Sequence, residues 1–273
     1  MAYSMHTPAF PLSQFVGCFW YWEGTPQAPA KERLMPMGEA CIILNLRDDH
    51  LRLYANDDVE RFETYGLAML SGARTAPFVI DNQQQDRVFG IQFRAAGTFP
   101  FFRIPADEIA DLAVPLDTLW YSGAGELRER LLAAASAESM FRVAESVMLA
   151  QAARALHLHP AVSFALGRFC RVPHSETVAE VTDRLGLSQR HFIQIFRDQV
   201  GLTPKALCRV RRFQYVLRSV HKAPEVDWVQ IALESGYYDQ AHFIHDFRSF
   251  SGLTPTQYWE SRTLHLNHVP IPQ

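Results

Sequence analysis

The sequence of 273 residues has no long apolar run, no closely spaced cysteines and little net charge. No segment approaches the roughly 18 uninterrupted apolar residues of a membrane span, and the first six residues lack the basic and apolar regions of a secretory signal. The four cysteines, Cys18, Cys41, Cys170 and Cys208, form no C-x-x-C pair of the kind that binds zinc or carries redox chemistry. These absences predict a cytoplasmic protein with reduced, mostly buried thiols and with no metal, cofactor or membrane partner.

The net charge of −3 conceals one strongly basic segment between residues 184 and 222. Nine cations there face the single acid Asp198, which gives a local charge of +8. The cations are Arg184, Arg190, Arg197, Lys205, Arg209, Arg211, Arg212, Arg218 and Lys222. A solvated helix face is the simpler interpretation of any one such run, but a segment this basic can also face phosphate groups.

The length exceeds that of a usual single domain, and the spacing of apolar residues changes along the chain. Short apolar or alternating runs bounded by Gly, Asn, Asp and Ser predict strands at 15–22, 40–46, 51–54 and 87–93. Apolar residues at helical spacing predict helices at 126–135 and 137–156. The expected fold class is α+β: residues 1–156 form a β-rich, cupin-like sandwich or barrel with trailing helices, and residues 157–273 form an all-α domain. The boundary is placed by Pro160, which disfavours a helix continuing through His159.

One segment of the second half occurs twice. Residues 190–204 read RHFIQIFRDQVGLTP and residues 241–255 read AHFIHDFRSFSGLTP, an offset of 51 residues. Such self-similarity indicates a supersecondary unit used twice. A short amphipathic helix precedes each copy, at 177–185 and 227–235, and a glycine and a capping residue follow that helix. The glycines are Gly186 and Gly236, and the caps are Ser188 and Asp239. This order predicts two helix-turn-helix units.

The second helix of each unit has an apolar and a polar face. Phe192, Ile195, Phe196 and Val200 in the first copy, and Phe243, Phe247 and Phe250 in the second, have the spacing of core residues. The outward residues are Gln189, Arg190, Ile193, Gln194 and Arg197 in the first copy and Gln240, Ala241, Ile244, His245 and Arg248 in the second. Their donors, cations and apolar groups suit base edges and thymine methyl groups, which makes them the candidate DNA-binding residues.

The two copies differ in charge. From residue 225 to 248 the acids Glu225, Asp227, Glu234, Asp239 and Asp246 face only Arg248. This local charge of −4 attracts phosphate poorly, so the second unit is expected to bind DNA more weakly than the first.

A long helix is expected to join the two units. Thr203-Pro204 and Thr254-Pro255 each combine an N-cap with proline at the first helical position. The helix from 204 to 220 would be about 25 Å long, enough to place the two units in successive major-groove segments about 34 Å apart. Its arginines cannot all be buried, so some are expected to face phosphate or the N-terminal domain.

With these motifs the segment from about 160 to 262 resembles the AraC/XylS family of transcriptional regulators. The resemblance rests on Leu185-Gly-Leu-Ser188 through Phe196-Arg197, on Ile231-Ala-Leu-Glu-Ser-Gly236 and on Gly252-Leu-Thr-Pro255-Thr-Gln-Tyr258. It implies two DNA readers per chain, with base-reading positions at Arg190, Ile193, Gln194, Arg197, Gln240, Ala241, Ile244 and His245. Two residues depart from the family pattern. Thr182 stands where a small Ala is usual, and Trp259 stands where an Arg is common.

The resemblance predicts a non-enzymatic transcriptional regulator, activator or repressor, whose partners are double-stranded DNA, a small-molecule effector, RNA polymerase and a second copy of the chain. Alternatives remain for the N-terminal part. The rings of Phe15, Phe19, Trp20, Tyr21 and Trp22 could line an effector pocket or simply fill the core. The domain could instead serve only for dimerisation, in a ligand-independent regulator or a protein-interaction module. A cupin-type enzyme would need clustered metal ligands, which are not evident, and a repair methyltransferase would need a reactive Cys208.

Overall fold

The computed structural model describes residues 2–24, 31–152, 154–170, 176–221 and 223–271. Its N-terminal part contains two antiparallel sheets, so of the two expected forms it is the sandwich and not the closed barrel. The first sheet has the order β1-β2-β9-β4-β7-β10, and its strands are Ala2–His6, Val16–Glu23, Arg87–Phe93, Cys41–Asn45, Ala68–Ser71 and Ala113–Pro115. The second has the order β11-β3-β8-β5-β6, and its strands are His268–Pro270, Lys31–Leu34, Phe78–Asp81, Leu51–Tyr54 and Phe62–Tyr65.

The four predicted strands correspond to β2, β4, β5 and β9, with bounds that agree to within one residue. The other strands have too few or too mixed residues to form a clear alternating pattern. The prediction of an all-α domain over residues 157–273 is corrected at its end: the last helix stops at Ser261, and the chain then returns to the N-terminal part as β11.

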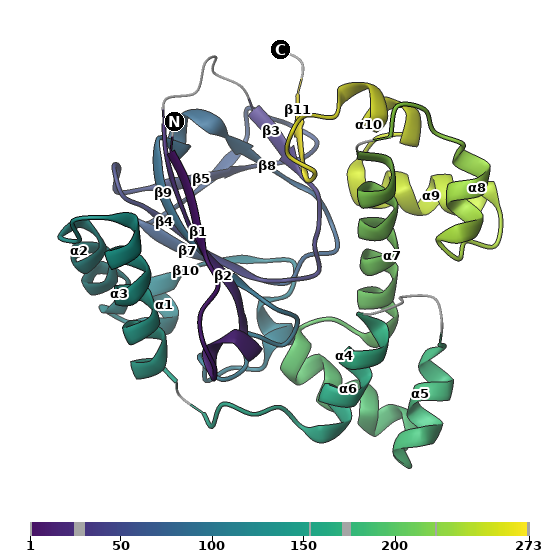
Figure 1. The fold of residues 1–273 in the computed structure, drawn as a ribbon, viewed down its shortest axis with the longest axis horizontal. Coiled ribbons are helices and arrows are strands. Elements are labelled where there is room, and N and C mark those ends of the chain that lie inside the picture. The colour runs from purple at the N-terminus through teal and green to yellow at the C-terminus, as the bar shows by residue number, and fades with distance from the viewer. Residues whose placement is uncertain (1, 25–30, 153, 171–175, 222, 272–273) are drawn as a thin grey trace.

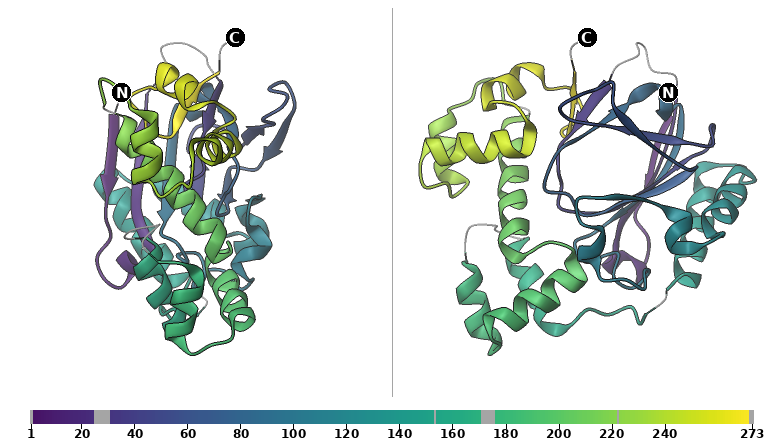
Figure 2. Two further views of the ribbon diagram at one scale, coloured as in Figure 1. Left: turned by 90° about the vertical axis from the view of Figure 1, so that its right-hand side faces the viewer. Right: turned by 180° about the vertical axis from the view of Figure 1, so that it is seen from behind.

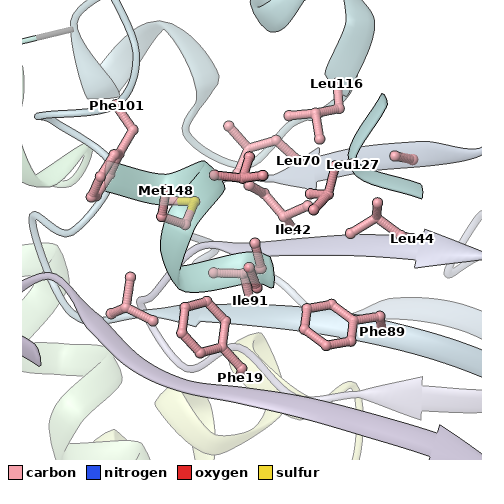
Figure 3. Packing of buried hydrophobic residues seen from close by; sticks show 14 of the residues in the cluster. Phe19, Ile42, Leu44, Leu70, Phe89, Ile91, Phe101, Leu116, Leu127 and Met148 are labelled. Atoms are coloured by element: carbon pink, nitrogen blue, oxygen red, sulfur yellow. The ribbon is translucent and has the colours of Figure 1, made fainter. Parts of the chain in front are cut away.

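Three helices, α1 (Leu116–Trp120), α2 (Gly123–Leu132) and α3 (Ala137–Ala150), cover one face of the first sheet. Figure 3 shows Phe19, Ile42, Leu70 and Ile91 of the sheet packed near Leu127 and Met148 of these helices. The predicted helix at 137–156 is six residues too long because α3 ends at Ala150. The helix predicted at 126–135 begins and ends three residues earlier, as α2.

The aromatic residues of β2 lie on two different faces. Phe15, just before the strand, and Phe19 and Tyr21 within it are buried in the core beneath α1–α3. Trp20 and Trp22 point to the opposite face, because successive side chains of a strand alternate, and both are only partly buried. Of the two alternatives left open for these rings, Phe15, Phe19 and Tyr21 follow the second and fill the core, so the five rings do not line one pocket.

The second half is helical apart from β11, and the rest of the described chain contains short 3-10 helices. The helices are α4 (Pro160–Phe169), α5 (Val178–Leu185), α6 (Gln189–Val200), α7 (Pro204–His221), α8 (Trp228–Glu234), α9 (Gln240–Ser251) and α10 (Pro255–Ser261), and the 3-10 helices are η1 (Leu12–Gln14), η2 (Asn82–Gln85) and η3 (Ala106–Ile109). In the described part of the chain, none of the helices has both the length and the apolar character to cross a membrane.

The long helix α7 runs beside the β-sheets and carries one helical group at each end (Figure 1). Figures 1 and 2 place α1–α3 and α7 on opposite sides of the sheets. The core around α4–α6 includes Ala73 and Ala96, and the core around α8–α10 includes Met35. Each helical group therefore packs against residues of the N-terminal part.

Candidate nucleic-acid interface

The first predicted unit is formed by α5 and α6. Thr177 and Glu180 form a capping box at the start of α5. Gly186 ends α5 with a φ of 64°, a left-handed conformation that glycine adopts without steric cost. The Ser188 hydroxyl accepts a hydrogen bond of 3.3 Å from the amide of His191 and so starts α6. The predicted helix, turn and cap are all present.

Burial separates the two faces of α6 largely as predicted. Phe192, Phe196 and Val200 are buried, while Ile195 is only partly buried. On the outward face Ile193 is partly buried, and the four predicted polar residues are exposed: Gln189, Arg190, Gln194 and Arg197. The polar face of α6 is therefore available to a ligand over most of its length.

Two of these exposed side chains have partners within the protein. The Arg197 guanidinium forms an ion pair of 2.9 Å with Asp107 of η3. Gln194 donates a hydrogen bond of 2.8 Å to Asp198 one turn later. Arg190 forms no salt bridge with any residue in the described ranges. All four polar residues face outward, as predicted, but Arg197 and Gln194 already have partners within the protein.

The second unit, α8 and α9, has the same construction. The Asp227 side chain caps α8, and Gly236 follows that helix with a φ of 75°. The Asp239 side chain accepts a 2.7 Å hydrogen bond from the amide of His242. Phe243, Phe247 and Phe250 are buried, Ile244 is partly buried, and the remaining outward residues are exposed. They are Gln240, Ala241, His245 and Arg248.

The acid Asp246 does not belong to the exposed surface of the second unit. Its side chain is only 3% exposed and forms a 2.6 Å ion pair with Arg209 of α7. Because Asp246 is paired and Asp227 and Asp239 cap helices, the predicted local charge of −4 overstates the repulsion of phosphate.

The cations of the basic segment are also less available to phosphate groups than the local charge of +8 indicates. Four of its arginines pair with carboxylates: Arg184 with Glu176, Arg197 with Asp107, Arg209 with Asp246 and Arg211 with Glu39. A fifth, Arg212, lies over the ring of Tyr237. Lys222 lies outside the described residues. Arg211 pairs with the N-terminal part, as was expected for some arginines of this helix.

The cysteines differ from the expectation of mostly buried thiols, because Cys170 is exposed and only Cys208 is fully buried. Burial raises the pKa of the Cys208 thiol to about 12, although Arg212 opposes that shift. A thiol with so high a pKa is a poor nucleophile at neutral pH. Within the described ranges no three His, Cys, Asp or Glu side chains are grouped closely enough to hold a metal ion.

The departures at positions 182 and 259 both have a structural setting. Thr182 is buried in α5, and its hydroxyl donates a 2.7 Å hydrogen bond to the carbonyl of Val178. The Trp259 ring lies 4.3 Å from the Arg262 guanidinium, which also bonds to the Trp259 carbonyl. Arg262, three residues after the position where the family pattern has an arginine, follows the end of α10 and is partly buried.

Comparison with known proteins agrees with this geometry. Residues 181–261 match a family model described as a helix-turn-helix domain, and residues 4–115 match a domain of unknown function. An uncharacterized HTH-type transcriptional regulator of Haemophilus influenzae is 33% identical over 91 residues, which cover 33% of this chain and 29% of that protein. The match thus spans less than a third of the relative's length.

Solved structures with a similar course of the chain include ToxT from Vibrio cholerae, at 10% identity, 95% coverage of this chain, 98% of that chain and a TM-score of 0.46. They also include the C-terminal domain of AraT, a response regulator from Geobacillus stearothermophilus, at 22% identity, 40% and 91% coverage and a TM-score of 0.37. Residues 181–261 therefore contain a helix-turn-helix domain, as the repeated motif predicts.

Proposed function

We propose that the chain is a sequence-specific, DNA-binding transcriptional regulator in which α6 is the main reader and α9 the weaker one. The observation that supports this most strongly is the exposed polar face of α6, where Gln189, Arg190 and Gln194 surround the partly buried Ile193. Arginine and glutamine at such positions form paired hydrogen bonds to base edges in the major groove. The second unit is held at the other end of α7, an 18-residue helix about 27 Å long.

The test begins with selection of genomic DNA fragments on the purified chain. Arg190→Ala and Gln194→Ala should each lose roughly 1–3 kcal/mol of discrimination between the selected duplex and a mismatched one. Arg142→Ala on α3, an exposed arginine far from α6 in sequence and paired with Glu138, is the matched control and should change nothing. Unchanged discrimination in both α6 variants, with folding intact, would contradict the base-reading assignment.

The second reader should tolerate substitution better. Gln240→Ala and His245→Ala should harm binding less than the α6 variants, because the exposed acids Glu225 and Glu234 lie on the same unit and repel phosphate. Equal mutational losses in both units and equal protection across the whole footprint would show that the readers are equivalent.

The N-terminal domain carries a surface that supports an effector. Tyr3 and Met5 of β1 lie directly opposite Trp22 and Trp20 of β2, so the four side chains share one face of the sheet. Tyr3 is 61% and Met5 60% exposed. The Trp20 ring lies flat over Gly90 of β9, where an added Cβ would be 1.9 Å from the ring. We assign this apolar face to a small molecule with a flat apolar part that modulates DNA binding.

Anilinonaphthalene sulfonate, a dye that fluoresces on apolar protein surfaces, provides a first probe of that face. Met5→Lys should reduce dye binding, whereas Leu264→Lys, at a residue that is 94% exposed elsewhere in the chain, should not. Because β1 is also an edge strand, its outer edge beside this face can pair with a second copy of the chain, which supports a homodimer. Sedimentation that shows a dimer of the wild type and a monomer of Met5→Lys would favour that role over an effector.

A further inference from the structure

The N-terminal domain contacts both recognition helices at the same position of the repeat. Gly201 ends α6 and Gly252 ends α9, and their numbers differ by the repeat offset of 51. A Cβ added at Gly201 would lie 3.0 Å from the carbonyl oxygen of Ala106 in η3. A Cβ added at Gly252 would lie 3.3 Å from Nη1 of Arg33 in β3. Two elements of one domain therefore press against equivalent ends of the two readers.

These contacts continue into the packed cores. Ala73 and Ala96 of the N-terminal domain belong to the apolar cluster that contains Phe196. Met35, two residues after Arg33, belongs to the cluster that contains Phe247. A cavity of about 10 Å³ beside Ala106 and Val200 has room for one water molecule at most. The end of α6 is thus held by close packing and by the Asp107–Arg197 ion pair, and the end of α9 is held by close packing.

The contact at α6 also occupies a DNA-binding side chain. Asp107 is only 17% exposed in its side chain, whereas its partner Arg197 is 45% exposed. While the 2.9 Å ion pair persists, the Arg197 guanidinium cannot neutralise a phosphate group. The Asp107 carboxylate in addition places a negative charge beside the face that would approach DNA.

We infer that the N-terminal domain holds the two recognition helices at Gly201 and Gly252, and that the Asp107–Arg197 pair limits the affinity of this form for DNA. This inference rests on the proposed function and adds the regulation of the same site. Packing against Ala73 and Ala96 positions α6, whereas the ion pair can be released, because an ion pair with one exposed partner contributes little net stability.

Asp107→Asn tests the inference in the full-length chain. The probe is a labelled duplex of mixed sequence and about 40 base pairs. It is long enough to include two successive major-groove segments, which lie about 34 Å apart. Release of Arg197 should tighten binding about two- to five-fold and steepen the plot of log affinity against log salt by about 0.9, the effect of one additional phosphate contact. Glu108→Gln is the matched control, since Glu108 is an exposed acid on the same 3-10 helix and forms no salt bridge within the described residues.

The double variant Asp107→Asn/Arg197→Ala should lose both the gain in affinity and the steeper salt dependence. If the wild type binds the duplex and Asp107→Asn binds it with the same affinity, the inference is overturned and the proposed function stays intact. The same holds if Glu108→Gln tightens binding as much as Asp107→Asn does. Absence of binding to any duplex by all variants, even at low salt, would overturn the proposed function and the inference with it.

Hydrogen exchange, measured without DNA, tests whether the N-terminal domain restrains the ends of the two recognition helices. Asp107→Asn should speed exchange in the last turn of α6, and Arg33→Gln should do so in the last turn of α9, each without effect on the other helix. Unchanged exchange at both helix ends would show that neither contact restrains its reader.

Discussion

At the scale of single residues, Thr182 shows how a polar side chain is accommodated in the core of the first unit. Threonine is a poorer helix former than alanine, yet it occupies a position in α5 that is only 4% exposed. Its hydroxyl is satisfied by the carbonyl of Val178, four residues earlier, at 2.7 Å. The residue therefore substitutes for a small apolar one without leaving a buried polar atom unpaired.

Thr182→Ala should change the free energy of unfolding by less than about 1 kcal/mol. Alanine gains up to about 0.7 kcal/mol in helix propensity and loses the burial of one methyl group, about 0.8 kcal/mol. Urea unfolding followed by circular dichroism measures the difference. Val181→Ala, in the same helix and fully buried, is the control and should cost about 2 kcal/mol because it leaves a cavity without compensation. A loss as large as that for Thr182→Ala would show that its hydroxyl has a larger role.

The residues that could be predicted from the sequence are those whose roles are local. Ser188, Asp239, Gly186 and Gly236 act within a few residues of themselves, so the chain around them is sufficient to predict caps and turns. The partner of Arg197 could not be predicted, because Asp107 lies 90 residues earlier in the sequence and in a different domain. For Phe19 and Trp20 the alternation of a strand does predict opposite faces, so the sequence itself argues against a single aromatic pocket.

At the scale of elements, β11 shows how the chain returns to its beginning. His268–Pro270 pairs with Glu32–Leu34 of β3, and the His268 imidazole lies 2.8 Å from the Glu32 carboxylate. Val269, which lies between His268 and Pro270, is 2% exposed and belongs to the core of the second unit. A strand of three residues that ends in proline has no recognisable sequence pattern. Its partner lies more than 230 residues away, so only the folded chain reveals the pairing.

The β11–β3 contact should weaken in acid. The hydrogen bond from His268 is the main reason why the pKa of Glu32 lies below its ordinary value of 4.5. The folded state therefore releases this proton more readily than the unfolded state. The resulting stabilisation is complete above pH 4.5 and is lost as the pH falls through the folded-state pKa.

Urea unfolding between about pH 3 and pH 6 measures this effect. Glu32→Gln has no carboxyl group to titrate at this position, so its stability should depend less on pH than that of the wild type. His268→Ala should raise the Glu32 pKa towards 4.5, which carbon-detected NMR of the carboxyl group can follow. Identical pH profiles for wild type and Glu32→Gln would contradict the assignment.

At the scale of the whole molecule, the segment from Met35 to Glu39 connects the two halves by lying along α7. The Gln214 amide of α7 donates a 2.9 Å hydrogen bond to the carbonyl of Pro36, and a Cβ added at Gly38 would lie 3.2 Å from the Val210 side chain. The Glu39 carboxylate reaches Arg211 at 2.5 Å. Burial, the largest single influence, would lower the pKa of Arg211, but the Glu39 carboxylate and the Cys170 side chain together raise that pKa above its ordinary value. The boundary predicted near residue 160 separates the chain in sequence, whereas these contacts join the halves in space.

Glu39→Gln should lower the free energy of unfolding by about 2–3 kcal/mol, because it leaves the largely buried Arg211 guanidinium without its counter-charge. Glu60→Gln is the control, since Glu60 pairs with Lys31 but is 85% exposed, and it should have little effect. The double variant Glu39→Gln/Arg211→Met should recover most of the loss, because methionine removes the unpaired charge and keeps the apolar stem.

Since both helical cores contain N-terminal residues, the wild type should unfold in urea in one transition that Glu39→Gln moves as a whole. Two separate transitions, neither displaced by Glu39→Gln, would mean that the halves fold independently and that α7 is not held by the N-terminal domain.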